Sequence, residues 1–493
     1  MARETNHRND RRGRRRMIAT RLVIGCCASI ALIVCAQTMP PTVGAALARA
    51  RIALDDVGIV VKEVGAKESA FALNADKAMN PASVIKLVTT YAGLELLGPA
   101  YTWKTEVSMV GDMRHGTLTG DVVLKGYGDP KLSVERFWML LRQLRERGLT
   151  TINGDLILDR SFFDAGPHDP AKFDGEALRS YNVGPDPLLL NFKTVRFFFA
   201  PSVDDKLVSI SPDVRPAQLE IVNRVKLIDG PCGEWRDRVI TDIQTPSPIK
   251  LKVTFTGHYS KRCGERAWNI SLLDHARFVG GVFAAMWKDI GGVWNGAVKL
   301  APVPAGARLI ATAESPPLAD AIRDINKYSN NVMARQLFLT LSAELDKPPG
   351  SQAASTQIIR DWLTKKNIAA PELNLDNGSG LSRSERISAA TLAQLLDAAW
   401  KSSVMPELMS SLSLVGVDGT MRRRAKSESI AGQAHIKTGT LNDSKAIAGY
   451  VLDANGRRWI VVMMINSPNA VFSQAALDAM LNTVYAANGA ANQ

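Results

Sequence analysis

The pattern of apolar and polar residues predicts strands at both ends of the chain and helices between them. Near the N-terminal end, VGIVVKEV and SAFALNAD are short β-like runs that predict a two-stranded hairpin. Near the C-terminal end, AHIKTGTL, KAIAGYVLD and RRWIVVMMINS predict three further strands, the last two joined by a turn at 454–456. We expect the strands from both ends to pair in one antiparallel sheet. Together with the helices, this predicts an α+β fold class.

The helical segments and a long β-rich block divide the rest of the chain. Helices are predicted at 83–97, at 318–345 as a pair, and at 355–366, 388–400 and about 473–487. Residues 101–290 instead contain short strands punctuated by Gly, Asp and Pro, interrupted by the helical run VERFWMLLRQLRERG. We therefore expect a core domain split into 50–100 and 291–487. The inserted region, 101–290, is expected to form two β-rich domains, with about 190–268 nested inside the other.

The N-terminal segment has the layout of a secretory signal peptide. A basic run, RRGRRRM, precedes the apolar run LVIGCCASIALIVCA at 22–36, and small residues follow. This apolar run is shorter than the roughly 20 residues of a membrane-spanning helix. We predict that 1–36 is a signal peptide and that the mature protein works outside the cytoplasm. An uncleaved anchor, with loose membrane association, stays open.

Half of the net positive charge of the chain lies in this N-terminal segment. The net charge is +12, and residues 1–36 carry eight Arg against two acids, which accounts for +6 of it. The remaining +6, spread over more than 450 residues, is a weak basis for nucleic-acid binding. We therefore predict no nucleic-acid partner.

Cysteine usage agrees with export. Of five cysteines, the two outside the N-terminal segment are Cys232 and Cys263. In an exported protein they are expected to form one disulfide, with two unrelated thiols as the alternative. No C-x-x-C or H-x-x-x-H spacing accompanies them, so no metal site and no cofactor are predicted.

Three short motifs carry the candidate chemistry. The first is Ser83 and Lys86, three residues apart at the start of a predicted helix and so on one face of it. Taken alone, the pair is better explained by an N-capping serine and a lysine that reaches solvent. The second motif, Ser329-Asn330-Asn331, lies where two predicted helices meet, and the third, Lys437-Thr438-Gly439-Thr440, lies on a predicted strand. All three, in this order, are typical of the penicillin-recognising serine acyltransferases.

The first two motifs can activate a nucleophile. A serine hydroxyl is a poor nucleophile and needs a base within hydrogen-bond reach. Lys86 can serve Ser83 as that base if burial and a neighbouring cation, Lys437, favour its neutral form. Ser329 can relay a proton to the leaving amine. Asn331 can hold Lys86 and the substrate backbone.

The third motif can bind substrate. The backbone N–H groups of Ser83 and Thr440 are the expected pair for an oxyanion hole. Gly439 lets a substrate backbone approach the strand closely. Lys437, Thr438 and Thr440 can together receive a carboxylate. The expected substrate is therefore an acyl group followed by a residue with a carboxylate.

At this point the chain resembles a known family, the penicillin-binding D-alanyl-D-alanine carboxypeptidase/endopeptidases of peptidase family S13, the class C low-molecular-mass type. Stretches similar to that family run from about 55 to 485. They include NPASVIKLVTTYAGLELLGP, GDVVLKGYGDPKL, SPPLADAIRDINKYSNNVMARQL, DNGSGLSRSERIS and HIKTGTLNDSKAIAGYV. Two positions depart from the common pattern: Asn330 stands where Asp is common, and Tyr127 where Gly is common.

The resemblance implies both a fold and an activity. The fold is a transpeptidase/β-lactamase-like core, an antiparallel sheet covered by helices, with two inserted β-rich domains. The activity is hydrolysis of D-Ala-D-Ala in peptidoglycan stem peptides in the periplasm, and also of the D-Ala–diaminopimelate cross-link. Ser83 would be acylated, Lys86 would be its base, and β-lactam antibiotics would act as covalent inhibitors. Ser329 and Asn331 would belong to the second motif, and Lys437 would bind substrate.

Two other functions stay open on the sequence. A β-lactamase or esterase on the same core would deacylate quickly, but no Glu-x-x-Asn element is placed to activate the water for it. A non-enzymatic cell-wall scaffold would have no need of a lysine-activated serine.

Overall fold

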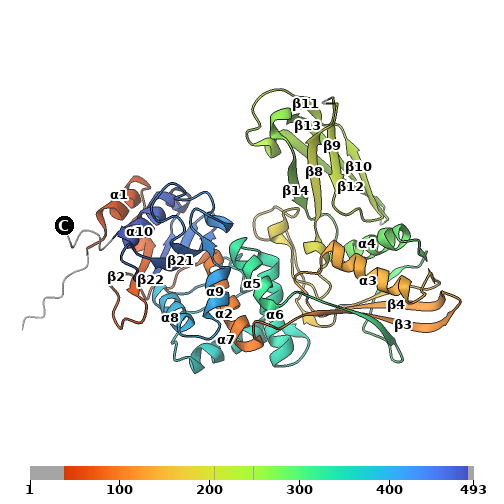
Figure 1. Cartoon of the computed structure of the whole chain (residues 1–493), viewed down its shortest axis with the longest axis horizontal. Coiled ribbons are helices and arrows are strands. Elements are labelled where there is room, and N and C mark those ends of the chain that lie inside the picture. The colour runs from red at the N-terminus through yellow and green to blue at the C-terminus, as the bar shows by residue number, and fades with distance from the viewer. Residues whose placement is uncertain (1–37, 205, 248, 487–493) are drawn as a thin grey trace, which may run out of the picture. The chain divides into compact units, whose positions relative to one another are not determined.

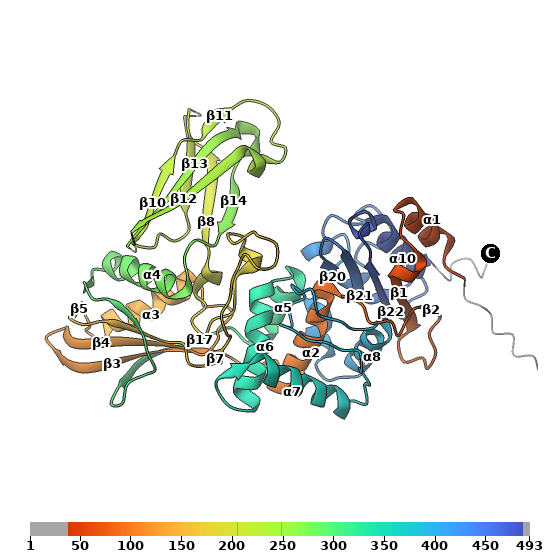
Figure 2. The same cartoon turned by 180° about the vertical axis from the view of Figure 1, so that it is seen from behind.

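The strands from both ends of the chain meet in one antiparallel sheet, as the hydrophobic pattern predicts (Figures 1 and 2). The computed structural model describes residues 38–204, 206–247 and 249–486, and the predicted signal peptide lies outside them. Within these residues, the strand order of this sheet is β19-β20-β21-β22-β1-β2. β1 (Val57–Glu63) pairs with β2 (Phe71–Leu73) as the predicted hairpin, and with β22 (Arg458–Asn466) across the whole chain.

Both faces of this sheet are buried, which explains the unbroken apolar run in β22. Its side chains point alternately to opposite faces. Ile460, Val462 and Met464 pack in one core cluster, with the helices α2, α5, α6 and α8. Val461, Met463 and Ile465 pack in another, with α1 and α10. The sheet is thus the middle layer of three (Figure 1).

The helices α2, α5, α6, α7, α8 and α10 follow the predicted segments within a few residues, whereas α1 and α9 lie where the sequence pattern predicts no helix. Their bounds are α1 Pro41–Arg49, α2 Lys86–Leu97, α5 Leu318–Lys327, α6 Asn331–Leu345, α7 Gln352–Lys365, α8 Ala389–Trp400, α9 Met405–Ser411 and α10 Gln474–Ala486. The remaining strands of the sheet are β19 Ser413–Leu414, β20 Ala434–Thr440 and β21 Ser444–Leu452. The helix expected over 83–97 differs at its start, because Ala82–Ile85 form a 3₁₀ turn that leads into α2.

The inserted region builds its own sheets around a separate hydrophobic cluster. One sheet joins β3, β4, β5, β6, β15, β16 and β17. Of the two smaller sheets, one joins β8, β9 and β14, and the other joins β10, β11, β12 and β13. The bounds are β3 Lys104–Arg114, β4 Thr117–Gly126, β5 Thr151–Ile152, β6 Leu156–Asp159, β8 Val195–Pro201, β9 Val208–Pro212, β10 Leu219–Asn223, β11 Lys226–Ile228, β12 Val239–Ser247, β13 Lys250–Ser260, β14 Arg266–Ile270, β15 Val293–Trp294, β16 Val298–Leu300 and β17 Arg308–Glu314. Two short strands, β7 Phe163–Asp164 and β18 Gly350–Ser351, pair with each other, and the helices are α3 Val134–Glu146 and α4 His275–Asp289.

Two details of the inserted region bear on the expected domain boundaries. The two smaller sheets meet through edge-to-face contacts of Phe255 on β13 with Phe197 and Phe199 on β8, inside the span expected to be nested. The larger sheet extends past the expected boundary at 290, because β17 pairs with β3. β15 and β16 are only two and three residues long, and β17, with seven, is mostly exposed, so none of them forms a long apolar run. The division into domains stays a prediction, and we place the end of the insertion near 314.

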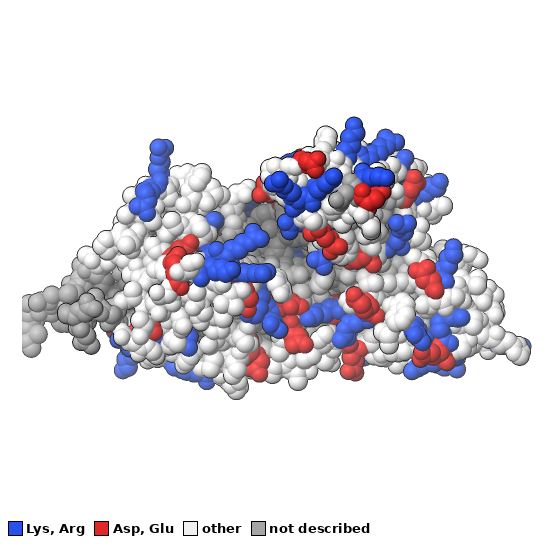
Figure 3. Space-filling view, turned by 45° about the horizontal axis from the view of Figure 1, so that its top comes forward, with Lys and Arg blue, Asp and Glu red and all other residues white. Residues whose placement is uncertain are grey.

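The two cysteines and the surface charges complete the description. Cys232 and Cys263 are joined by a disulfide that links the segment after β11 to the 3₁₀ turn Lys261–Cys263, which follows β13. Basic and acidic side chains are interspersed over the face drawn in Figure 3. Among the described residues, no helix is both long and apolar enough to span a bilayer. The same residues contain no cluster of three or more His, Cys, Asp or Glu side chains arranged to hold a metal ion.

Candidate active site

Ser83 lies on the short 3₁₀ turn before α2, and this turn is anchored to the sheet. The side chain of Asn80 accepts a hydrogen bond from the backbone N–H of Ala82, at 2.9 Å. Asn80 also exchanges two hydrogen bonds with Asn466 at the end of β22, at 2.7 and 2.9 Å. No side-chain capping hydrogen bond is formed at the start of this turn or of α2, within the described chain. Ser83 is therefore not an N-cap.

Lys86 does not reach solvent. Its side chain is completely buried, and its Nζ donates to Ser83 Oγ at 3.0 Å and to Asn331 Oδ1 at 2.7 Å. It also donates to the backbone carbonyl of Ser379. The structure thus brings the first and second motifs together, with the lysine in direct hydrogen-bond contact with the serine.

The second motif occupies the corner between α5 and α6. Ser329 adopts a left-handed backbone conformation, φ 55°, which turns the chain between the two helices. Asn330 caps α6 by accepting from the backbone N–H of Met333 at 3.1 Å, so Asn can do at this position what Asp does at many N-caps. Asn331, the first residue of α6, points its amide oxygen at Lys86 and donates from Nδ2 to the carbonyl of Tyr181 at 3.2 Å.

The third motif lies on β20 and reaches the second through its lysine. Lys437 is fully buried, and its Nζ donates to Ser329 Oγ at 2.9 Å and to its neighbour's carbonyl at 2.7 Å. β19 pairs with β20 only as far as Ile436 in the described chain, so 437–440 present a free strand edge. Thr438 Oγ1 donates to Thr420 at 2.8 Å, and Thr440 is exposed. A free edge of this kind can add an extended peptide as a further strand.

Gly439 lets β20 pass close to the Ser83 turn. A Cβ at this position would lie 2.5 Å from the carbonyl oxygen of Pro81 and 3.1 Å from the backbone nitrogen of Ser83. Both obstacles are backbone atoms, so a side chain here would force the strand and the turn apart. The close approach brings the N–H of Ser83 next to the strand that carries the N–H of Thr440.

We expect Gly439→Ala to lower the rate of acylation by about 100-fold, because a shift of the nucleophile by about 1 Å costs roughly that much. The measurement is the rate of covalent labelling by a fluorescent penicillin. Gly44→Ala on α1 is the control, since its Cβ would meet the nearest side chain at an ordinary 3.5 Å. Equal labelling rates for both variants would show that the close approach is not needed.

Burial and neighbouring charges set the protonation of the two lysines. Burial lowers the pKa of Lys86 well below its ordinary value, and the charge of Lys437 lowers it further. Glu385 raises the pKa of Lys86, whereas Arg335 lowers it, as Lys437 does. Burial also lowers the pKa of Lys437, to about 7. A neutral Lys86 can accept a proton from Ser83 at neutral pH.

The loop 376–385 supplies contacts that sequence reasoning missed. Ser379 contributes a backbone carbonyl to Lys86. The buried carboxylate of Glu385 holds the turn before it, accepting from the N–H groups of 376, 377 and 378 at 3.4, 3.1 and 2.8 Å. The signal that could have found this loop is its stretch DNGSGLSRSERIS, which resembles the same family as the three motifs.

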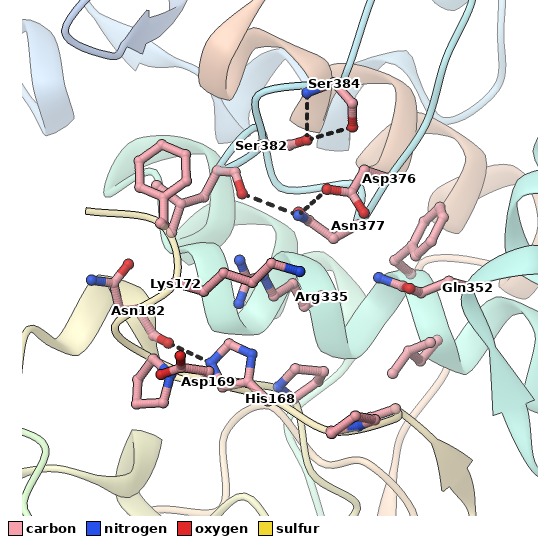
Figure 4. Close-up of a pocket in the computed structure, with 18 of the residues that line it drawn as sticks. His168, Asp169, Lys172, Asn182, Arg335, Gln352, Asp376, Asn377, Ser382 and Ser384 are labelled. Carbon is pink, nitrogen blue, oxygen red and sulfur yellow. Dashed lines mark hydrogen bonds between the residues drawn. The ribbon is translucent and has the colours of Figure 1, made fainter. Parts of the chain in front are cut away.

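A cavity of about 510 Å³ opens beside this loop and α6 (Figure 4). Arg335 lies one turn after Asn331 on α6 and faces the loop residues Asp376 and Asn377, with Lys172 and His168 on the other side. Arg335 and Lys172 are cationic and Asp376 is anionic, so the lining suits a ligand that carries both charges. The cavity is thus a candidate extension of the site around Ser83.

The fold is that of a penicillin-binding protein. The structure matches the crystal structure of penicillin binding protein 4 from Haemophilus influenzae with a TM-score of 0.73 and 23% sequence identity. The match covers 91% of this chain and all of that one. The same protein in complex with a β-lactam matches with a TM-score of 0.69, at 22% identity over 90% of this chain and 99% of that one. This confirms the predicted transpeptidase/β-lactamase-like fold class.

The sequence comparisons identify the family. The model of the D-Ala-D-Ala carboxypeptidase 3 (S13) family matches residues 41–485, and the chain belongs to this family. A D-alanyl-D-alanine carboxypeptidase, DacB, of Haemophilus influenzae is 25% identical over 421 residues, 83% of this chain and 85% of the relative. A D-alanyl-D-alanine carboxypeptidase of Actinomadura is also 25% identical, over 81% of this chain and 76% of the relative.

Proposed function

We propose that this protein is a serine D,D-carboxypeptidase and D,D-endopeptidase that acts on peptidoglycan stem peptides through an acyl-enzyme on Ser83. One observation carries the proposal: the buried Nζ of Lys86 lies 3.0 Å from Ser83 Oγ. Membership of the D-Ala-D-Ala carboxypeptidase family supports the substrate class. The β-lactam complex of the related penicillin binding protein 4 supports covalent inhibition of this chain by β-lactams.

In the proposed acylation step, neutral Lys86 accepts the hydroxyl proton of Ser83, and Oγ attacks the carbonyl carbon of the penultimate D-alanine. The backbone N–H groups of Ser83 and Thr440 stabilise the negative charge that develops on the carbonyl oxygen. The C–N bond then breaks, and the proton held by Lys86 is relayed through the hydroxyl of Ser329 to the leaving nitrogen. Ser329 thus keeps a proton and Lys86 returns to its neutral form, so the step needs no co-reactant. Water then hydrolyses the ester.

Substrate orientation is assigned to β20 and the groups around it. The extended peptide pairs with the free edge at 437–440. The carboxylate of the terminal D-alanine, or of the residue that replaces it in a cross-link, is received by Lys437 with the hydroxyls of Thr438 and Thr440. The mixed charges of the cavity beside Arg335 suit the rest of a stem peptide, which carries both ammonium and carboxylate groups.

This role of Lys437 predicts a characteristic pH dependence. Lys437 binds a carboxylate only when protonated, and its pKa in the free protein is about 7. We therefore expect kcat/KM for a soluble pentapeptide to fall as the pH rises through about 7. In the enzyme–substrate complex, the bound carboxylate raises the pKa of Lys437. We therefore expect kcat to fall at a higher pH than kcat/KM does.

The control is a pentapeptide whose terminal carboxylate is replaced by an amide. It should be hydrolysed more slowly, without the fall near pH 7, because it gives Lys437 no charge to bind. If kcat/KM depended on pH in the same way for the acid and the amide, Lys437 would not be the group that recognises the carboxylate.

The location and processing of the protein are proposed with the same function. An exported enzyme is needed to reach peptidoglycan, and the signal peptide predicted at 1–36 would deliver it to the periplasm. Retention of this segment would give loose membrane association. A core of 50–100 and 315–487 that carries the chemistry, with an insertion at 101–314, is the domain division that the separate hydrophobic clusters support.

The test is hydrolysis of purified muropeptides followed by mass spectrometry of the products. A carboxypeptidase converts a pentapeptide to a tetrapeptide and releases D-alanine. An endopeptidase converts a cross-linked dimer to monomers. If the protein cleaved neither bond and formed no covalent adduct with penicillin, the remaining hypothesis would be a non-enzymatic cell-wall scaffold. Rapid release of hydrolysed penicillin without peptide cleavage would instead indicate a β-lactamase.

A further inference from the structure

A second basic hollow lies on the inserted region, apart from the cavity beside Arg335. Its volume is about 260 Å³, and three arginines line it: Arg179, Arg196 and Arg236. Two aromatic residues, Tyr181 and Trp268, also line it, together with Ser180, Ala267 and Asn269. No Asp or Glu is among the described residues that line it. We refer to the three arginines and the two aromatic residues as the arginine groove.

Carboxylates of the protein neutralise little of the positive charge of the arginine groove, as the contacts of its arginines show. Arg179 forms an ion pair with Glu176 at 3.2 Å, but both side chains are about half exposed and the pair is weak. Arg236 donates to the carbonyl of Ala267 at 3.2 Å, and in the described chain it makes no ion pair with a carboxylate. Its guanidinium also lies 5.6 Å from the ring centre of Trp235.

Arg196 is held in a similar way. Its guanidinium lies over the ring of Phe198, 5.5 Å from the centre, while its backbone N–H donates to the carboxylate of Asp213 at 2.8 Å. Within the described residues its side chain has no carboxylate within 4.0 Å. Exposed guanidinium groups held by carbonyl and aromatic contacts are suited to bind carboxylates in a bidentate manner.

The arginine groove is connected to the candidate active site through Tyr181. The backbone carbonyl of Tyr181 accepts from Asn331 Nδ2 at 3.2 Å, and the other end of that amide holds Lys86. The hydroxyl of Tyr181 donates to Asp174 at 2.9 Å, which fixes the ring at the edge of the groove. A polymer that enters the active site can therefore meet the groove within a short distance.

We propose that the arginine groove docks a second stem peptide of the same peptidoglycan polymer while the first is cleaved at Ser83. This inference rests on the proposed function. Stem peptides recur along a glycan strand and carry free carboxylates, which match the charge of the groove. The rings of Tyr181 and Trp268 offer apolar contact to the linking sugars and peptide. Two linked contacts raise the effective concentration of substrate at the site, so the groove favours polymer over single peptides.

The test compares two substrates in one triple variant, Arg179→Ala/Arg196→Ala/Arg236→Ala. We expect its turnover of intact peptidoglycan sacculi at low salt to fall by about tenfold, the size expected for a few exposed charge contacts. Hydrolysis of a soluble pentapeptide and covalent labelling by penicillin should stay within about twofold of the unmodified protein. Salt should slow the unmodified protein on sacculi and leave the triple variant nearly unaffected.

The matched control is Arg224→Ala, which removes an exposed arginine of the inserted region that does not line the groove. Sacculus turnover by the triple variant equal to that of the control would overturn the proposal. Parallel loss of pentapeptide hydrolysis would overturn it too, because the arginines would then act on the catalytic residues. The proposal would also be overturned if the unmodified protein bound phosphatidylglycerol vesicles and the triple variant lost this binding but kept its sacculus turnover. The partner of the three arginines would then be a membrane. If the unmodified protein neither cleaves pentapeptide nor takes up penicillin, the proposed function itself has failed.

Discussion

Replacement of Ser83 by alanine is expected to abolish the covalent penicillin adduct and to lower pentapeptide hydrolysis by a factor on the order of 10⁴ or more. In the proposed mechanism this hydroxyl forms the ester, and among the described residues the side chain of Lys86 donates its other hydrogen bonds only to the amide oxygen of Asn331 and the backbone carbonyl of Ser379. Mass spectrometry of the intact protein after incubation with penicillin measures the first effect. Peptide mapping assigns the adduct to the segment that contains residue 83.

Ser247→Ala is the matched control for this variant. Ser247 and Lys250 repeat the S-x-x-K spacing, but they lie on β12 and β13 of the inserted region rather than beside a second and third motif. The control should form the adduct at the normal rate. An adduct that survives Ser83→Ala would move the nucleophile elsewhere and remove the basis of the proposed mechanism.

Replacement of Lys86 by methionine is expected to lower the rate of acylation by about 10³-fold, within the range for loss of a general base. Methionine preserves the volume of the buried side chain but accepts no proton. In the unmodified protein, the lowered pKa of Lys86 means that the neutral base is present well below pH 10.5, so acylation proceeds at neutral pH. In Lys86→Met, we expect this pH dependence to disappear along with the rate.

Lys327→Met separates loss of a base from loss of a buried lysine. Lys327 is also buried, but its Nζ pairs with Asp418 at 2.6 Å and donates to the carbonyl of Leu412 at 2.9 Å. In the part of the chain that the structure describes, its side chain forms no hydrogen bond with a residue of the three motifs. Its removal leaves a partly buried carboxylate unpaired, so it should lower the melting temperature while the folded protein is still acylated. Equal losses of acylation in the two variants at a temperature where both are folded would contradict a specific role for Lys86.

The sequence predicted the part of the site that short motifs encode. In the structure, Lys86 is hydrogen-bonded to Ser83 and Asn331, and Lys437 is hydrogen-bonded to Ser329, the residue two positions before Asn331. Their proximity was foreseeable because each motif sits at a place that the hydrophobic pattern locates: a helix start, a helix junction and a strand. The catalytic roles of these residues stay predictions until the variants are measured.

What the sequence did not reveal acts mainly through the backbone or over long range. The carbonyls of Ser379 and Tyr181 hold Lys86 and Asn331, and any residue type can supply a carbonyl. Glu385 in a stretch of serines and arginines looks like an ordinary surface acid, yet it is completely buried. The extent of the larger inserted sheet depended in the same way on the pairing of β17 with β3, two strands far apart in sequence.

The pairing of β1 with β22 also determines when during synthesis this serine can become reactive. Ser83 is among the first residues of the described chain to be made, but the strand beside β1 and the lysine-bearing strand β20 are among the last. Until these strands arrive, the turn that holds Ser83 lacks Asn466 and Lys437, and β1 has no partner on that edge. In the proposed mechanism, a partly synthesised chain therefore carries an unactivated serine. The order of synthesis would then keep Ser83 unreactive until the C-terminal strands have been made and paired.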